Sequence, residues 1–310
     1  MNTGVSQRGP ETVTRDEGLS GSGEKTAATD FARFGAVELD VVDLDRSLPF
    51  WETAVGLEVF DRTAGVATLG AGNNTLLRLY EGAERPALRG HSGLYHLAIH
   101  VPDQEEFSTV LARLIAHRLP IAPTDHVMSK AIYLDDPDGI GLEITLETPE
   151  RMRSMSLSNG QPVVIDAEGR VRSGRDPLNI RAELDASASD IHRSLSPGTV
   201  IGHVHLHVAD VDRALAFYSR LGFQMGTHSK EFGFADMHGG GVFRHRMAVN
   251  TWQGKGATPR PAGVAGLRRF EIRYANPEQR ESVIAELAGE LRAGDEGDVR
   301  DPDSHRIALL

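Results

Sequence analysis

The 310-residue sequence contains no cysteine, which excludes disulfides, thiolate metal ligands and thiol nucleophiles. Any bound metal must therefore be held by imidazole and carboxylate groups. No window approaches the roughly 18 consecutive apolar residues that a membrane helix requires, so no membrane partner is expected. The net charge is −11 and the sequence has no basic run, which argues against a nucleic-acid partner.

What is present is typical of a globular protein. Hydrophobic residues make up 40% and charged residues 25% of a chain that is long enough for two ordinary domains. Residues 1–30 are polar, rich in Gly, Ser and Thr, and lack the apolar core of a secretion signal. They predict a disordered tail, and the cytoplasm is the expected compartment. Whether the chain forms a homo-oligomer is left open.

The chain repeats itself, and internal repetition is best settled before the fold. Three pairs of segments match: Asp43–Trp51 with Asp210–Tyr218, Gly93–Ile99 with Gly266–Ile272, and Asp136–Gly139 with Asp301–Ser304. The chain is therefore built from two kinds of half-unit, each used twice. The copies differ in the residues that could hold a metal, and this difference locates the candidate site.

Hydrophobic periodicity predicts a strand, a helix and further short strands in these units, which indicates an α+β fold. The expected strands are 36–42, 66–69 and 75–80 in the first unit, 95–101, 131–134 and 142–146 in the second, 201–208 in the third and 268–274 in the truncated fourth. Helices are expected to begin after Asp43 and at Gln104. Such small units should pair into curved, mostly antiparallel sheets.

The predicted domain boundaries follow from these units. A first domain covers residues 31–150 with modules one and two, and a second covers residues 198–310 with modules three and four. Residues 151–197 match neither unit. They predict a linker with one short strand, Val163–Ile165, and a short helix.

Histidine and glutamate residues stand where apolar side chains are expected. Side chains alternate along a strand, so His203, His205 and His207 should share one face. Three imidazoles on one buried face are hard to justify as packing, whereas His96 alone could be a hydrogen-bonded core residue. Glu143 lies between two apolar neighbours and would be costly to bury without a cation. Two imidazoles and one carboxylate on a face are typical of non-haem Fe(II) oxygenases.

Four stretches together carry a resemblance to a known family. They are Gly202-His203 with the following Asp210–Tyr218 helix, Gly93-Leu-Tyr-His96, the run from Asp125-His126 to Glu143, and Arg244–Trp252. On these residues the chain resembles the vicinal oxygen chelate superfamily, and within it the extradiol ring-cleaving dioxygenases similar to bacterial catechol 2,3-dioxygenase. The resemblance implies four βαβββ modules paired into curved mixed or antiparallel half-barrel sheets, over about residue 34 to the C-terminus.

The resemblance also implies the metal site. In extradiol enzymes one His comes from the first strand of a module, and a second His and a Glu come from its partner module. Here these positions are His203, His96 and Glu143. The implied cofactor is Fe(II), with Mn, Ni and Zn as alternatives that the same ligands accept.

Three further positions carry over by the same resemblance. The His that contacts dioxygen and acts as an acid and base falls on His245, and a substrate-side Tyr falls on Tyr133. A further substrate-side His falls on His126, in an alignment that needs a gap. The implied partners are a small catechol-like or hydroquinone-like aromatic compound and O2.

Comparison of the repeats selects the modules that form the site. Ala36 stands where the third module has His203, and Ala308 stands where the second has Glu143. Arg269 replaces His96. One metal site per chain is therefore expected between modules two and three, with the outer modules structural. A swapped site between two chains remains an alternative.

Other interpretations stay open at this point. His205 could replace His203 as a ligand, and His207 is interpreted as structural. Lys130, Arg244 and Arg246 either favour an anionic substrate or are solvated surface charges. Two other functions are a non-oxidative metal-dependent isomerase, lyase or hydrolase of the same superfamily and a ligand-sequestering resistance protein, which would need neither His245 nor Tyr133.

Overall fold

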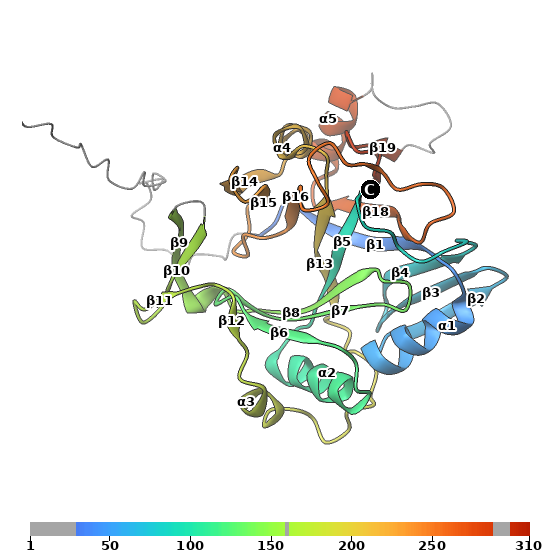
Figure 1. Ribbon diagram of the computed structural model, residues 1–310, viewed down its shortest axis with the longest axis vertical. Coiled ribbons are helices and arrows are strands. Elements are labelled where there is room, and N and C mark those ends of the chain that lie inside the picture. Colours follow the sequence, from blue (N-terminus) through green and yellow to red (C-terminus); the bar gives the residue numbers. More distant parts are fainter. Residues whose placement is uncertain (1–28, 159–160, 288–297) are drawn as a thin grey trace, which may run out of the picture.

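The computed structural model describes residues 29–158, 161–287 and 298–310, so the predicted tail lies outside the described residues up to residue 28. Two curved sheets form the body of the protein, and the helices lie around them (Figure 1). The helices are α1 (Leu44–Pro49), η1 (Phe50–Val55), α2 (Gln104–Ala116), η2 (Pro149–Arg151), α3 (Ile180–Leu184), α4 (Val211–Arg220) and α5 (Pro277–Leu287).

The larger sheet has ten strands and joins the second repeat unit to the third. Its order is β12-β6-β7-β8-β5-β13-β16-β15-β14, with β17 paired to β5. The bounds are β5 (His91–His100), β6 (Ala122–Asp125), β7 (Ser129–Asp135), β8 (Gly141–Glu147), β12 (Asp176–Pro177), β13 (Val200–His207), β14 (Gln224–Ser229), β15 (Phe234–His238), β16 (Met247–Asn250) and β17 (Thr258–Pro259). Strands β5 and β13 form its centre, and they pair antiparallel.

The smaller sheet has seven strands and joins the first repeat unit to the fourth. Its order is β19-β20-β18-β1-β4-β3-β2. The bounds are β1 (Ala32–Val41), β2 (Glu58–Thr63), β3 (Val66–Ala71), β4 (Asn74–Glu81), β18 (Gly266–Tyr274), β19 (Asp298–Arg300) and β20 (Arg306–Leu309). The expected α+β architecture of paired units with curved, mixed sheets is confirmed, and the described residues of the short fourth unit add β18, β19 and β20 to this sheet.

The hydrogen-bonded sheets therefore unite the outer two units and the inner two units. Contacts between a helix start and a hairpin turn also join successive units, in the same way twice. The backbone N–H of Val42 donates to Asp138 Oδ2 at 2.9 Å, and that of Ala209 donates to Asp303 Oδ1 at 2.9 Å. These matching contacts support the repeat alignment. The domain boundaries near residues 150 and 198 stay a prediction.

The segment predicted as a linker contains more structure than the sequence indicated. Strands β9 (Met152–Ser158), β10 (Gln161–Asp166) and β11 (Val171–Arg172) form a separate antiparallel sheet, followed by β12 and α3. This inserted sheet stands at the edge of the molecule beside β12 and β6 (Figure 1). The single expected strand at Val163–Ile165 is therefore one of a group.

Local sequence explains where the first helix begins and ends. Asp43 caps α1, because its carboxylate accepts hydrogen bonds from the backbone of Asp45 and Arg46. Pro49 lies inside this helical stretch, and the next turn continues as the π-helix η1. Gly56 ends it with a φ of 97°, a left-handed conformation that glycine adopts without strain. No helix in the described ranges is long and apolar enough to span a bilayer.

One buried cation links the end of η1 to the segment that follows α3 by hydrogen bonds. The side chain of Arg113 on α2 is fully buried and donates to the carbonyls of Ala54 and Val55 at the end of η1. It also donates to the carbonyls of Ile191 and Arg193, at 3.0 and 2.7 Å. A single guanidinium thus satisfies backbone acceptors that would otherwise be buried without partners.

We expect Arg113→Met to lower the free energy of unfolding by about 3 kcal/mol or more, because several buried carbonyls lose their donor at once. Urea denaturation measures this change. Arg181→Met on the exposed face of α3 is the control, with an expected change within about 0.5 kcal/mol. Equal stability of the two variants would contradict a stabilising role for the hydrogen bonds of Arg113.

Candidate metal centre and active site

The candidate site lies at the centre of the larger sheet, where β8, β5 and β13 are neighbours. The pairing of β5 with β13 places His96 opposite His205 and Ala98 opposite His203. The parallel pairing of β5 with β8 places Ala98 opposite Glu143. Since side chains two residues apart on a strand share a face, His96, Glu143 and His203 meet above Ala98.

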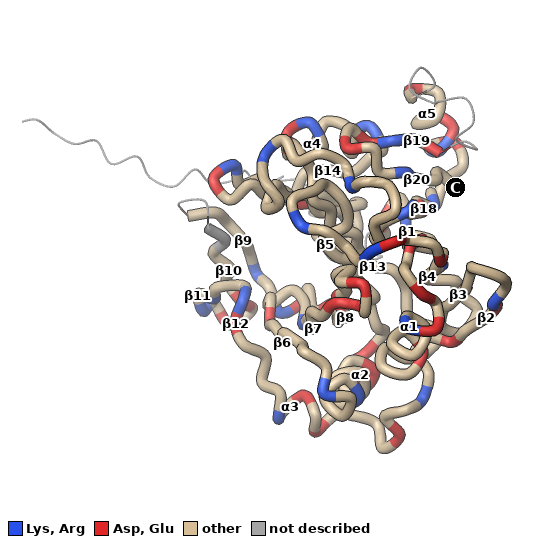
Figure 2. The backbone as a smooth tube through the Cα atoms, turned by 45° about the vertical axis from the view of Figure 1, so that its right-hand side comes forward, with Lys and Arg blue, Asp and Glu red and all other residues tan. Residues whose placement is uncertain are grey.

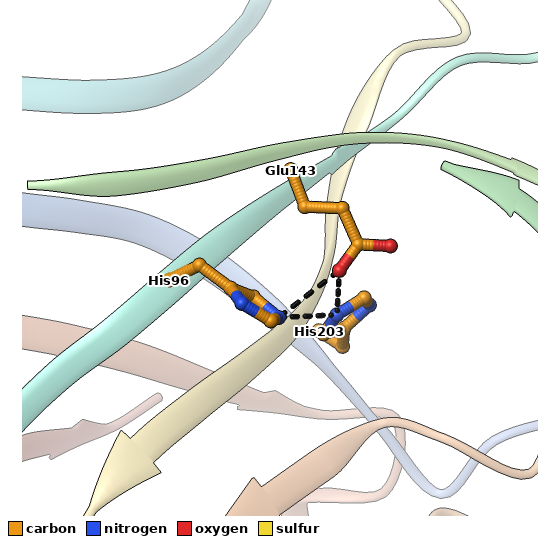
Figure 3. A group of neighbouring side chains, drawn as sticks. All are labelled: His96, Glu143 and His203. Atoms are coloured by element: carbon orange, nitrogen blue, oxygen red, sulfur yellow. Dashed lines mark hydrogen bonds and ion pairs between the residues drawn. The ribbon is translucent and has the colours of Figure 1, made fainter. Parts of the chain in front are cut away.

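The three side chains converge within one chain. Glu143 Oε2 lies 3.0 Å from His96 Nε2 and 3.1 Å from His203 Nε2, and the two imidazole nitrogens are 3.2 Å apart. Figure 3 shows them pointing toward one another from three different strands. The residues are only 4%, 2% and 1% exposed in the order His96, Glu143, His203. A site swapped between two chains is not needed to assemble them.

These separations fit a metal ion. Two ligand atoms about 2.1 Å from a metal and at right angles to each other are about 3.0 Å apart. Three mutual separations near this value are those of three adjacent positions on one side of an ion, which leaves the opposite positions for other ligands. In the described part of the chain, this is the group of His, Asp and Glu side chains that meets the geometric requirement.

The protonation states also suit a cation. Burial lowers the pKa of His203 well below its ordinary value, so the imidazole is neutral and has a lone pair for a metal. Burial works to raise the pKa of Glu143, but its contacts with His203 and His96 outweigh burial and hold that pKa well below the ordinary range. Glu143 is therefore ionised, and Thr145 donates to its other oxygen at 2.8 Å.

A line of hydrogen bonds fixes the orientation of His203. Its Nδ1 lies 2.8 Å from His100 Nε2, and His100 Nδ1 lies 2.8 Å from Glu147 Oε1. Arg246 forms an ion pair with Glu147, and its Nε donates to Asp30 at 2.9 Å. The tautomer that this network favours places protons on both Nδ1 atoms, which leaves His203 Nε2 free to bind a metal.

Glycine at position 202 makes this line of hydrogen bonds possible. A Cβ at Gly202 would lie about 2.0 Å from the ring of His100, far closer than any real contact. A larger residue would push the His100 ring away from His203. The Gly-His pair of the sequence motif therefore has a steric reason.

His245 lies beside these three candidate metal ligands and has its own carboxylate partner. Its Nδ1 is 3.0 Å from Asp236 Oδ2, and its ring centre is 4.8 Å from that of His203. Asp236 is buried and also accepts a hydrogen bond from the backbone of Thr227. With Nδ1 engaged, Nε2 of His245 has no hydrogen-bond partner in the described residues and is available to a ligand in the cavity that His245 lines.

Tyr133 and His126 form a pair at the same cavity. The Tyr133 hydroxyl lies 2.8 Å from His126 Nε2, and His126 Nδ1 donates to the carbonyl of Gly174 at 2.6 Å. Since Nδ1 carries the proton, Nε2 accepts from the tyrosine. Burial and the nearby Glu143 carboxylate raise the pKa of Tyr133 well above 10.0, so its hydroxyl stays protonated. The structure thus places both residues in the wall of this cavity, and the substrate-side role of His126 stays a prediction.

The other two histidines of β13 face the same side but have different partners. Asn250 Nδ2 donates to His205 Nε2 at 2.8 Å, and Asn250 Oδ1 accepts from His207 Nδ1 at 2.7 Å. Burial lowers the pKa of both imidazoles, that of His205 well below 6.5. Because this amide occupies His205 Nε2, His203 is the better candidate for a ligand.

A cavity of about 330 Å³ opens in front of these groups, and His96, Glu143, His203 and His245 line its polar end. The rest of its wall is largely apolar, with Met155, Leu157, Val164, Phe232, Phe234 and Trp252. The first three of these side chains belong to the inserted sheet. The cavity is therefore suited to a small aromatic molecule with polar groups at one end.

Sequence comparisons agree with this architecture. The profile of the Glyoxalase/Bleomycin resistance protein/Dioxygenase superfamily matches residues 33–144, and that of the bleomycin resistance protein-like N-terminal family matches residues 201–240. Catechol-2,3-dioxygenase of Bacillus subtilis (strain 168) is 34% identical over 262 residues, which are 83% of this chain and 88% of that protein. The chain belongs to the glyoxalase/bleomycin resistance/dioxygenase superfamily.

Solved structures of this superfamily fold are similar in shape, though distant in sequence. A candidate dioxygenase from Bacillus subtilis has a TM-score of 0.56 at 13% identity, covering 91% of this chain and 86% of its own. Glyoxalase I from Zea mays has a TM-score of 0.51 at 16% identity, covering 90% and 92%. The expected vicinal oxygen chelate fold is thereby confirmed.

In this vicinal oxygen chelate chain, the smaller sheet has ion pairs at the positions that correspond to the candidate metal site of the larger sheet. Arg269, at the position of His96, bonds to Glu38 at 2.8 Å and to Asp298 at 3.2 Å. Ala36 and Ala308 stand at the other two ligand positions and are buried. The smaller sheet thus replaces metal ligands with a guanidinium and carboxylates, which agrees with a structural role for the outer units.

Lys130, Arg244 and Arg246, the three cations considered for an anion site, bind other side chains. Lys130 forms an ion pair with Glu183 at 2.8 Å, and Arg246 pairs with Glu147. Arg244 donates to His238. None of the three lines the cavity, so the interpretation that they favour an anionic substrate is wrong.

Sequence reasoning missed several residues that support the site. His100 stands four residues after His96 on the same strand, so alternation alone could have placed both on one face. Alternation could not identify Asp236, because its role depends on a contact with His245, which lies in a loop outside its strand. The inserted sheet had no periodic signal strong enough to place it over the cavity.

The Glu147 carboxylate gives a pH-dependent prediction. Burial works to raise its pKa, but His100 and Arg246 outweigh burial and lower it from 4.5 to about 2. A carboxylate with a lowered pKa contributes stability above its unfolded pKa and loses that contribution as the pH falls. We therefore expect metal-free Glu147→Gln to be less stable than the metal-free wild type at pH 5, with a smaller difference at pH 3. Urea unfolding of both proteins at pH 5 and at pH 3 measures the stability difference. The same difference at the two pH values would contradict a charge effect.

Proposed function

We propose that this protein is a non-haem Fe(II)-dependent extradiol ring-cleaving dioxygenase that acts with O2 on a catechol-like or hydroquinone-like aromatic compound. The convergence of His96, Glu143 and His203 beside His245 carries the proposal. Two imidazoles and a carboxylate with open positions opposite are the ligand set of such oxygenases. The relationship to catechol-2,3-dioxygenase of Bacillus subtilis supports the same reaction class.

Fe(II) is the metal we assign to His96, Glu143 and His203, and Mn, Ni and Zn are the alternatives to test. When bound, the metal would supply a site for substrate oxygen, which in a catechol is its two vicinal oxygens, and for dioxygen. The protein contributes orientation, proton transfer and the exclusion of water. Phe234 and Trp252, in the apolar wall, hold the substrate ring.

Tyr133 and His126 act on a substrate hydroxyl. The Tyr133 oxygen can accept a hydrogen bond from that hydroxyl, since its own proton is directed at His126 Nε2. A proton can then pass from substrate to Tyr133 and from Tyr133 to His126 without entering water. The Gly174 carbonyl keeps His126 in the tautomer that accepts it.

His245 acts as the acid and base beside His203. Asp236 holds its Nδ1, so Nε2 can accept a proton and later return it to a developing oxygen anion. A protein that only sequesters a ligand has no need of a paired imidazole at this place. The His245–Asp236 pair therefore favours catalysis over sequestration.

Anaerobic purification, Fe(II) loading and metal analysis test the proposal, followed by oxygen uptake on a panel of catechols and hydroquinones. We expect stoichiometric oxygen consumption and a yellow ring-cleavage product with at least one catechol. An iron-loaded protein that consumes no oxygen with any compound would contradict the proposal. Turnover without oxygen would instead support a non-oxidative enzyme of the same superfamily.

A further inference from the structure

A single lysine or arginine side chain, that of Arg175, lines the cavity in the described part of the chain. It comes from the turn between β11 and β12, where Figure 2 shows blue basic segments beside β6. The carboxylates that line the cavity already have partners. Glu143 contacts His96 and His203, and Asp236 contacts His245.

Arg175 has no carboxylate partner among the described residues. Its neighbours of opposite charge are engaged, because Asp176 pairs with Arg172 at 2.7 Å and Asp125 pairs with Arg151 at 2.7 Å. The guanidinium instead lies 5.2 Å from the ring centre of Phe232. A cation beside an aromatic ring keeps its hydrogen-bond donors available to a ligand.

The turn that carries Arg175 is fastened to the active site. His126 Nδ1 donates to the carbonyl of Gly174, the residue before Arg175. On the other side, Ser173 Oγ accepts from the backbone of Arg175 and donates to Asp176. The position of the guanidinium is therefore linked to the pair of residues assigned to the substrate hydroxyl.

A wall of aromatic rings connects the guanidinium to the candidate metal ligands. Phe232 contacts Trp252 at 5.2 Å between ring centres, Trp252 contacts Tyr95 at 5.4 Å, and Tyr95 contacts His96 at 4.7 Å. Arg175 thus stands at the far end of an apolar wall that begins at the site.

From this arrangement we infer that Arg175 determines substrate specificity by binding an anionic substituent, such as a carboxylate, on the side of the aromatic ring away from the two oxygens that bind the metal. The inference rests on the proposed function and adds the substrate class: aromatic diols with a negatively charged side group. A neutral diol would leave the guanidinium without a partner. A diol with a carboxylate supplies the oxygen acceptors that a planar guanidinium binds through two donors.

The test compares carboxylated catechols with their neutral amides of the same shape. Protocatechuate and dihydrocaffeate place the carboxylate at two distances from the diol, and each has an amide counterpart. We expect the wild type to prefer at least one acid over its amide in kcat/KM. Arg175→Gln should reduce that acid-to-amide preference about tenfold, mainly through KM. Arg175→Lys should retain part of it.

Arg153→Gln is the matched control, because it removes one positive charge from the exposed side of the same inserted sheet and does not line the cavity. Its acid-to-amide preference should equal that of the wild type. Added salt should weaken the preference of the wild type but not that of Arg175→Gln. Equal preference in wild type and Arg175→Gln would overturn the inference.

Anaerobic calorimetry of the metal-loaded protein with the same compounds separates this inference from the proposed function. If acids bind more tightly than amides and Arg175→Gln abolishes the difference, the anion site stands even when no oxygen is consumed. If the wild type consumes oxygen on catechols but binds acids and amides equally, the proposed function stands and the role of Arg175 is wrong.

Discussion

Glu143→Ala is expected to lose the metal. Affinity for Fe(II) should fall by at least about a hundredfold, because even residues that only support a metal ligand contribute up to this amount. Glu143 is the one carboxylate among the three proposed ligands, and an imidazole brings no negative charge to balance a divalent cation. Oxygen uptake should fall to the background level. Metal analysis after anaerobic loading measures the first effect.

The fold should tolerate this change, since Ala308 occupies the equivalent strand position in the fourth unit. Circular dichroism of the metal-free variant checks this. Glu150→Ala, on the exposed turn after the same strand, is the control and should load metal like the wild type. Full iron loading of Glu143→Ala would remove the basis of the proposed site.

His245→Ala is expected to separate metal binding from turnover. The variant should retain its iron, because His245 is not one of the three converging residues, and its kcat should fall by about a hundredfold to ten-thousandfold. Such losses are usual when a side chain that transfers a proton is removed. Metal content and oxygen uptake on one sample give both values.

Two further variants serve as comparisons for His245→Ala. Asp236→Asn should cause a smaller loss, since the imidazole remains but loses the carboxylate that orients it. His117→Ala, on the exposed end of α2, should be as active as the wild type. A fully active His245→Ala would show that the acid-base role assigned to this residue is wrong.

Some features of this protein could be read from a single sequence because their causes are local. The cap at Asp43, the end of the first helix at Gly56 and the shared face of His203, His205 and His207 follow from the chemistry of neighbouring residues. The resemblance then indicated which histidines to combine with Glu143. Comparison of the repeats showed that the outer units have no metal-binding residue type at the three positions equivalent to His203, His96 and Glu143, and ion pairs of Arg269 lie there.

Other features depended on contacts that no local pattern records. Lys130, Arg244 and Arg246 looked available as cations, but each has a partner from a distant or adjacent segment. The inserted sheet was expected to be a linker, yet it supplies part of the cavity wall and the Arg175 turn. Its few, short strands contain too little periodicity to predict their pairing.

The sequence by itself thus determined which residue types can bind a metal and which face of each strand they occupy, because alternation acts over a few residues. The tertiary structure alone decided which strands are neighbours. His203 and Glu143 are 60 positions apart, and Arg246 and Glu147 are 99 apart. Contacts over such separations form only when the whole sheet assembles, so their partners become visible only in the folded chain.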